Sequence, residues 1–188
     1  MIEWPNKKRF AFTIVDDTDC STLENAPLIY DYFYKCGLKT TKTVWIFDGE
    51  KRKDNLRIIG STCEDKSYLN WVKELKKMGF EIGLHSASWS SSKRDRVIEA
   101  FDIFKSHFGE DPGILIQHTD NRECEAIYWG KKRVSGIYRL IYSLLMKIKG
   151  VDRNIYFGEV KDSDYFWGDI CKERIKYVRN FVYPEINT

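Results

Sequence analysis

The sequence predicts an α/β fold in which parallel strands alternate with helices. Two observations predict it: short β-branched and aromatic runs recur along the chain, and amphipathic segments of helical period lie between them. Near-continuous apolar runs are typical of parallel strands buried on both faces, and strict alternation means that crossover helices join them. This order indicates an α/β barrel or an open, doubly wound sheet. The six candidate strands are 9–15, 41–47, 80–84, 113–117, 155–160 and 176–183.

Four helices are expected between these strands. Three of them, 26–36, 66–78 and 94–108, each carry an apolar face and are followed by a glycine that ends the helix.

The fourth expected helix, 135–149, has both an apolar face and basic neighbours. Packing against the sheet explains the apolar face best. Its basic residues, together with 131–133, also fit a peripheral contact with an anionic membrane surface, which we rank second. The residues expected to be buried on this face are Ile137, Ile141, Leu144, Leu145 and Ile148.

Length and composition narrow the class of protein. A chain of 188 residues predicts one domain, 1–188. With 31 Lys and Arg against 28 Asp and Glu, the net charge of +3 is too small for a dedicated nucleic-acid binder. No apolar run reaches about 18 residues, so no membrane span is expected. Five cysteines without a C-x-x-C pair, and no secretory signal, favour the reducing cytoplasm.

Chemically active side chains gather where the predicted strands end. Asp16 and Asp17 follow the first strand, His85 the third and His118 the fourth. In α/β barrels the catalytic groups come from the carboxyl ends of strands. Neighbouring residues on an extended segment point opposite ways, so one carboxylate can bind a metal while the other reaches elsewhere. A divalent metal ion such as zinc suits this mixture of carboxylate and imidazole.

Two of these strand ends resemble the motifs of one enzyme family. The segments 13–17 (TIVDD), 37–43 (GLKTTKT) and 79–86 (GFEIGLHS) resemble the first two motifs of the NodB-type polysaccharide deacetylases, carbohydrate esterase family 4. The resemblance implies an incomplete or open (β/α) barrel of that type. It also implies that Asp16 is the catalytic base, and that Asp17 and His85 bind the metal.

The chain departs from this family at three points. Trp89 stands where the second motif normally has another metal-binding histidine, and 117–122 (QHTDNR) replaces the third motif. The late motif with the general acid would lie beyond the end of this chain or is absent. His118 is therefore a candidate third metal ligand, a candidate general acid, or a residue that only stabilises its loop. Trp89 is a candidate platform for a sugar ring or a core aromatic. Asn121 and Arg122 are candidates for substrate binding, or for a helix cap and a surface ion pair.

These residues predict a metal-dependent, deacetylase-like hydrolase acting on an acetylated sugar or glycan-biosynthesis intermediate. Its partner would be a small molecule or glycan. Two alternatives remain: an inactive NodB-like domain that binds glycans or acts as a scaffold, and a hydrolase of a non-peptide C–N bond in a small molecule.

Overall fold

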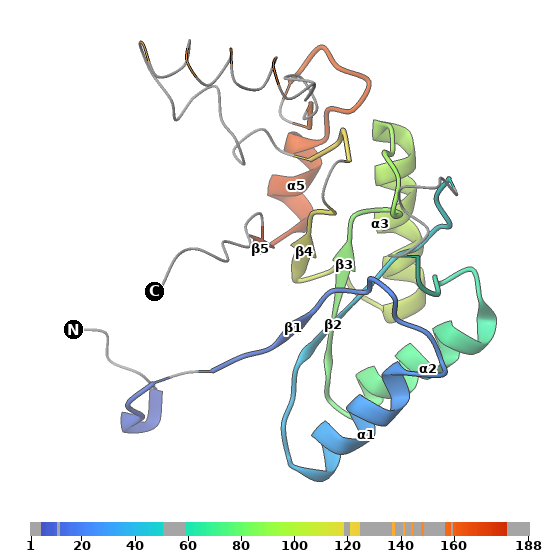
Figure 1. Cartoon of the computed structure of the whole chain (residues 1–188), viewed down its shortest axis with the longest axis vertical. Helices are drawn as coiled ribbons and strands as arrows, with labels where there is room; N and C mark the ends of the chain where they lie inside the picture. The colour runs from blue at the N-terminus through green and yellow to red at the C-terminus, as the bar shows by residue number, and fades with distance from the viewer. Residues whose placement is uncertain are drawn as a thin grey trace.

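Five parallel strands form one sheet and follow one another across it in chain order. The computed structural model describes residues 5–10, 12–50, 59–118, 121–124, 137, 141, 144, 148, 157–158 and 160–179. Within these residues the sheet curls into an open half-barrel (Figure 1). The predicted α/β class with parallel strands is confirmed. The strands are β1 Val15–Asp16, β2 Thr41–Val44, β3 Glu81–His85, β4 Ile114–Ile116 and β5 Tyr177–Arg179.

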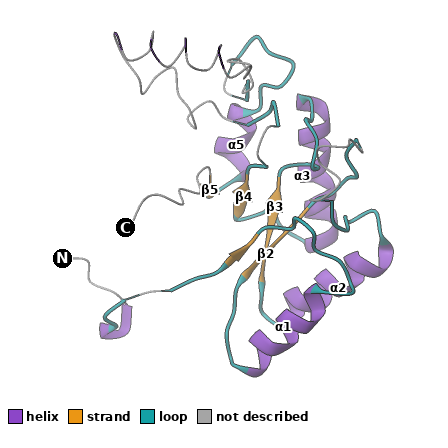
Figure 2. Cartoon of the chain, in the orientation of Figure 1, coloured by secondary structure: helices purple, strands orange, loops and turns teal. Residues whose placement is uncertain are grey.

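The helices lie beside the sheet, as Figure 2 shows. One helix starts where the Asp65 carboxylate accepts hydrogen bonds from the backbone N–H groups of Ser67 and Tyr68, which is a standard N-cap. The next ends at Gly109, whose φ of 83° is the left-handed conformation that favours glycine. The elements are the 3-10 turn η1 Pro5–Lys7 and the helices α1 Ala26–Lys35, α2 Lys66–Lys77, α3 Arg94–Phe108 and α5 Gly168–Arg174.

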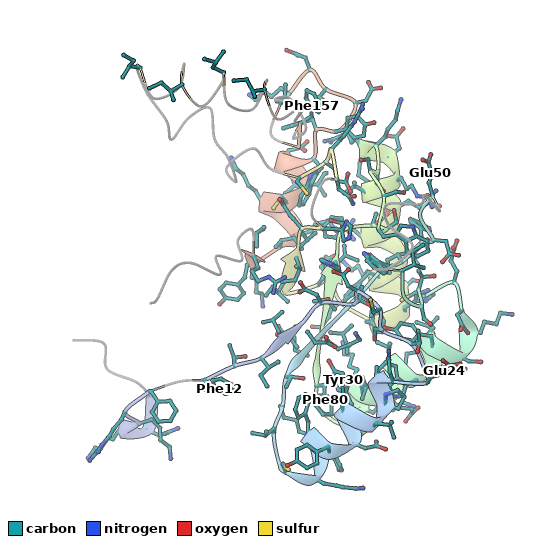
Figure 3. The ribbon with its side chains drawn as sticks, viewed as in Figure 1. Phe12, Glu24, Tyr30, Glu50, Phe80 and Phe157 are labelled. Carbon is teal, nitrogen blue, oxygen red and sulfur yellow. The ribbon has the colours of Figure 1, made fainter. Side chains whose placement is uncertain are left out.

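The hydrophobic core fills the space between the sheet and these helices. Tyr30 of α1 lies with its ring 5.1 Å from that of Phe80, in an edge-to-face arrangement; Figure 3 shows the two residues beside each other. Val72 of α2, Phe101 of α3 and Leu84 of β3 are each no more than 1% exposed. The core therefore holds one face of the sheet against the helices.

The strand predictions needed correction. Strand β1 shares only Val15 with the predicted strand 9–15 and extends to Asp16, because Val15 and Asp16 are the residues that pair with β2. Phe12, on the extended segment before it, is 76% exposed and lies away from the sheet (Figure 3). Gly158, within the predicted strand 155–160, bonds instead to the loop residues Cys124 and Trp167. The described sheet thus has five strands rather than about six; residues 155, 156 and 159 lie outside the described part.

The expected burial of the fourth helix was wrong. Its described residues Ile137, Ile141, Leu144 and Ile148 are helical, but their side chains are 68%, 50%, 60% and 74% exposed. Leu145 lies outside the described residues. The helical period was predicted correctly, whereas packing of this face on the sheet was not.

Candidate metal centre

Each of the five described strands has a chemically active or aromatic side chain at or just after its carboxyl end. Asp19 follows β1, Trp45 follows β2, His85 ends β3, His118 follows β4 and Arg179 ends β5. Because the strands are parallel, these ends lie at the same edge of the sheet. This is the edge at which α/β folds place their active sites.

Three of these side chains could hold a metal ion. One ligand atom from each of Asp19, His85 and His118 lies within 4.8 Å of the others. The Asp19 Oδ1 atom is 3.4 Å from Nε2 of His85 and 3.7 Å from Nε2 of His118. Both histidines are buried, with 2% and 6% exposure. The sequence-predicted pair of histidines thus converges, together with an acid that the sequence analysis did not select.

Asp19 Oδ1 and His85 Nε2 are buried and lie 3.4 Å from each other, but neither makes a hydrogen bond of good geometry within the described residues. A buried polar atom without a partner costs free energy, and a divalent cation between these atoms would satisfy both. The residues present therefore fit a bound metal.

The surroundings of the two imidazoles orient them for this role. His85 Nδ1 lies 3.2 Å from the carbonyl oxygen of Ile116, and His118 Nδ1 lies 3.4 Å from Oδ1 of Asn121. In the tautomer in which each Nδ1–H donates to that oxygen, the Nε2 lone pair is directed at Asp19. Metal-binding histidines are commonly fixed in this way.

The charge on Asp19 suits a metal ligand. Burial by itself would raise its pKa, but the neighbouring His85, His118 and Arg179 lower it, and the net pKa lies below the ordinary value. Asp19 is therefore ionised at neutral pH.

The backbone next to two of the candidate ligands adopts an uncommon conformation. Cys20 and Ser86, which directly follow Asp19 and His85, have φ values of 58° and 51°. Such left-handed conformations are costly for residues other than glycine and cluster at functional sites. Ser86 also accepts a hydrogen bond from the backbone N–H of His118 at 3.0 Å, which ties the ends of β3 and β4 together.

Two tryptophans, Trp45 and Trp89, pack beside the metal centre. Trp45 is fully buried and stacks on His85, with ring centroids 5.6 Å apart, and it meets His118 edge-on. Trp89 packs edge-on against Trp45, is 3% exposed and donates from Nε1 to the carbonyl oxygen of Glu50. Trp89 thus occupies a core position, and the second imidazole comes from the next strand as His118.

Asp16 and Asp17 are not among the three residues whose ligand atoms converge. The Asp16 carboxylate accepts hydrogen bonds from Tyr30 at 2.9 Å and from the fully buried Lys42 at 3.0 Å, so it faces α1. The Asp17 carboxylate is bound by Arg179 at 2.5 Å. The opposite directions of the two side chains agree with strand geometry. The catalytic role of Asp16 and the metal-binding role of Asp17 stay predictions.

The other predicted site residues lie in the loop after β4. Asn121 is 2% exposed, and its Nδ2 donates to the carbonyl oxygen of Ser88 and to Oε1 of Glu123. Arg122 is exposed, with its guanidinium 6.0 Å from the ring centre of Tyr165. Asn121 therefore contacts the Nδ1 atom of His118, and its contact with substrate stays a prediction.

Sequence reasoning missed Asp19, Trp45 and Arg179. Asp19 lies two residues after Asp17 and Arg179 lies in the last predicted strand, but neither position alone indicates that the side chain reaches the centre. Comparisons with family models, with curated proteins and with solved structures found no match to this chain. One carboxylate and two imidazoles are a three-ligand set of the kind that catalytic zinc sites use, which keeps a position for water or substrate.

Proposed function

We propose that this protein is a metal-dependent hydrolase that removes an acetyl group from a sugar or a glycan-biosynthesis intermediate. The observation that carries the proposal is the buried group of Asp19, His85 and His118, whose ligand atoms lie within 4.8 Å of one another. The resemblance of 13–17 and 79–86 to NodB-type deacetylases supports the acetyl substrate and the barrel type. A bound divalent ion, zinc by the nature of its ligands, would lower the pKa of water to about 7 and polarise the acetyl carbonyl.

The chain's own residues would divide the remaining work. Asp19, His85 and His118 hold the ion, and Asn121 orients the His118 ring. Asp17 would accept the proton from water at a carboxylate oxygen. The Arg179 guanidinium that binds this carboxylate also acts electrostatically on Asp19, which indicates that Asp17 lies near the metal group. Asp16, which the resemblance designates as the base, has its carboxylate bound by Lys42 and Tyr30.

The test uses a matched pair of histidine variants. Wild type, His85→Gln and His107→Gln are loaded with zinc, dialysed and analysed for bound metal and for acetate release from N- and O-acetylated sugars. His107 lies on α3, outside the metal group. We expect stoichiometric zinc and acetate release from wild type and His107→Gln, and loss of both from His85→Gln. Unchanged metal content and activity in His85→Gln would overturn the proposal.

An inactive, glycan-binding domain is the second candidate, and Trp89 favours it. This residue stands where the resemblance expects a second histidine, and its ring is buried against Trp45. Absence of metal under zinc-replete conditions, together with retained glycan binding, would support this candidate. Metal-dependent hydrolysis of a small amide without an acetyl group would support the C–N hydrolase instead, since it needs the same groups.

A further inference from the structure

One helical stripe of aliphatic side chains has no role in the metal centre. Ile137, Ile141, Leu144 and Ile148 are spaced by four, three and four residues and are each at least half exposed. At 3.6 residues per turn, their positions fall within an arc of roughly 60° around the helix axis. An exposed apolar stripe of this kind normally marks a surface that binds a membrane or another protein.

The charge of the surrounding sequence indicates what covers it. Residues 131–149 include six basic residues and no acidic residue. Helix α1 offers a contrast: its exposed Leu28 and Ile29 lie in a stretch that contains both Glu24 and Asp31. Aliphatic residues on one helical face, in a segment whose charged residues are all basic, are typical of helices that lie in a membrane interface.

We propose that the stripe of Ile137, Ile141, Leu144 and Ile148 binds the surface of an anionic phospholipid membrane. The aliphatic side chains enter the boundary between headgroups and acyl chains, and the basic residues of 131–149 attract the acidic headgroups. No helix in the described part of the chain is long and apolar enough to cross a membrane. The proposal is independent of the metal centre, since none of its residues contributes to that group.

The experiment measures sedimentation of the full chain with large unilamellar vesicles. One set contains phosphatidylcholine alone, and the other contains phosphatidylcholine with 30 mol% phosphatidylglycerol. The test variant is Ile141→Glu with Leu144→Glu. The matched control is Ile29→Glu with Leu28→Glu, because it also replaces one exposed isoleucine and one exposed leucine on a helix. Circular dichroism checks that each variant is folded, and light scattering records the oligomeric state.

We expect wild type and the control to bind the anionic vesicles at least tenfold more tightly than the neutral ones. The test variant should lose at least tenfold in affinity for anionic vesicles, and Lys147→Gln with Lys149→Gln should reduce the preference for them. Equal binding to both vesicle types, no binding by wild type, or equal losses in test and control variants would overturn the proposal. Dissociation of an oligomer in the test variant, without vesicle binding by wild type, would show instead that the stripe is a protein contact.

Discussion

Arg179 donates from Nη2 to both carboxylate oxygens of Asp17. Asp17 follows β1 and Arg179 ends β5, so the ion pair joins the two outermost strands of the half-barrel at the end that carries the metal centre. The two side chains are 32% and 28% exposed, which leaves the pair partly shielded from water. The same guanidinium lowers the pKa of Asp19. One cation therefore acts on two of the acids in the loop after β1.

Removing this cation should loosen the two edges of the sheet. We expect Arg179→Gln to lower the free energy of unfolding by about 1 kcal/mol, which is the upper end of the range measured for ion pairs at protein surfaces. Urea titration measures the change. The control is Lys93→Gln, which breaks the exposed pair with Asp164 and should have no measurable effect. Equal effects of the two substitutions would contradict a role for Arg179 in joining the strands.

The metal centre predicts different results for two acids of the same loop. Asp19→Asn should weaken zinc binding by more than roughly tenfold, because it removes the negative charge of a metal ligand. Loss of a residue that only contacts a ligand costs roughly tenfold. Asp17→Asn should keep the metal, since its carboxylate is bound by Arg179, and should lose acetate release. Titration against a competing chelator measures the affinities. The opposite pattern would make Asp17 the ligand, as the resemblance to the deacetylases implies.

The fold could be predicted where local patterns determine it. Helix α3 has the predicted bounds of 94–108, because an apolar face of helical period ends at a glycine in the left-handed conformation. Strand β1 has only two residues, because a strand extends only as far as its neighbour pairs with it, and pairing is not local. The stripe that includes Ile137 has the predicted helical character. Its exposure was mispredicted because periodicity identifies an apolar face without identifying what covers it.

The residues of the metal centre, too, could be predicted only where a local pattern indicates them. His85 and His118 could be selected because they stand at strand ends, and parallel topology brings such ends together. Asp19 could not, because its direction depends on the loop after β1, where Cys20 has a φ of 58°. Arg179 was missed because nothing local indicates that β5 lies opposite β1.

Asp16 is expected to stabilise the fold through Lys42, which is fully buried and also donates to Ser21. Asp16→Asn should lower the free energy of unfolding by about 2 kcal/mol, because a buried ammonium loses its carboxylate partner while Ser21 remains. Thermal and urea unfolding measure the loss, and Asp16→Asn with Lys42→Met should recover part of it. Loss of acetate release with unchanged stability would instead identify Asp16 as the catalytic base.

Glu123 is a buried acid that supports the loop carrying His118. Its side chain accepts hydrogen bonds from the backbone N–H of Ser92 and from Nδ2 of Asn121, both at 2.9 Å. Burial nevertheless raises its pKa from 4.5 to about 7, since a carboxylate without water is disfavoured. Glu123 thus keeps its proton in the folded protein over a pH range in which it is ionised in the unfolded chain.

The stability of the protein should therefore depend on pH through Glu123. Between pH 4.5 and 7 the folded state binds more protons at this site than the unfolded state, so the stability contributed by the site falls as the pH rises. Relative to Glu123→Gln, the wild-type free energy of unfolding should decrease by about 3 kcal/mol over this range and change little above it. Urea titrations at several pH values measure the difference. Glu110→Gln is the control with the opposite sign, because Lys76 lowers the pKa of Glu110 and its contribution is lost as the pH falls. A difference between wild type and Glu123→Gln that rises with pH would show that Glu123 is ionised in the folded protein.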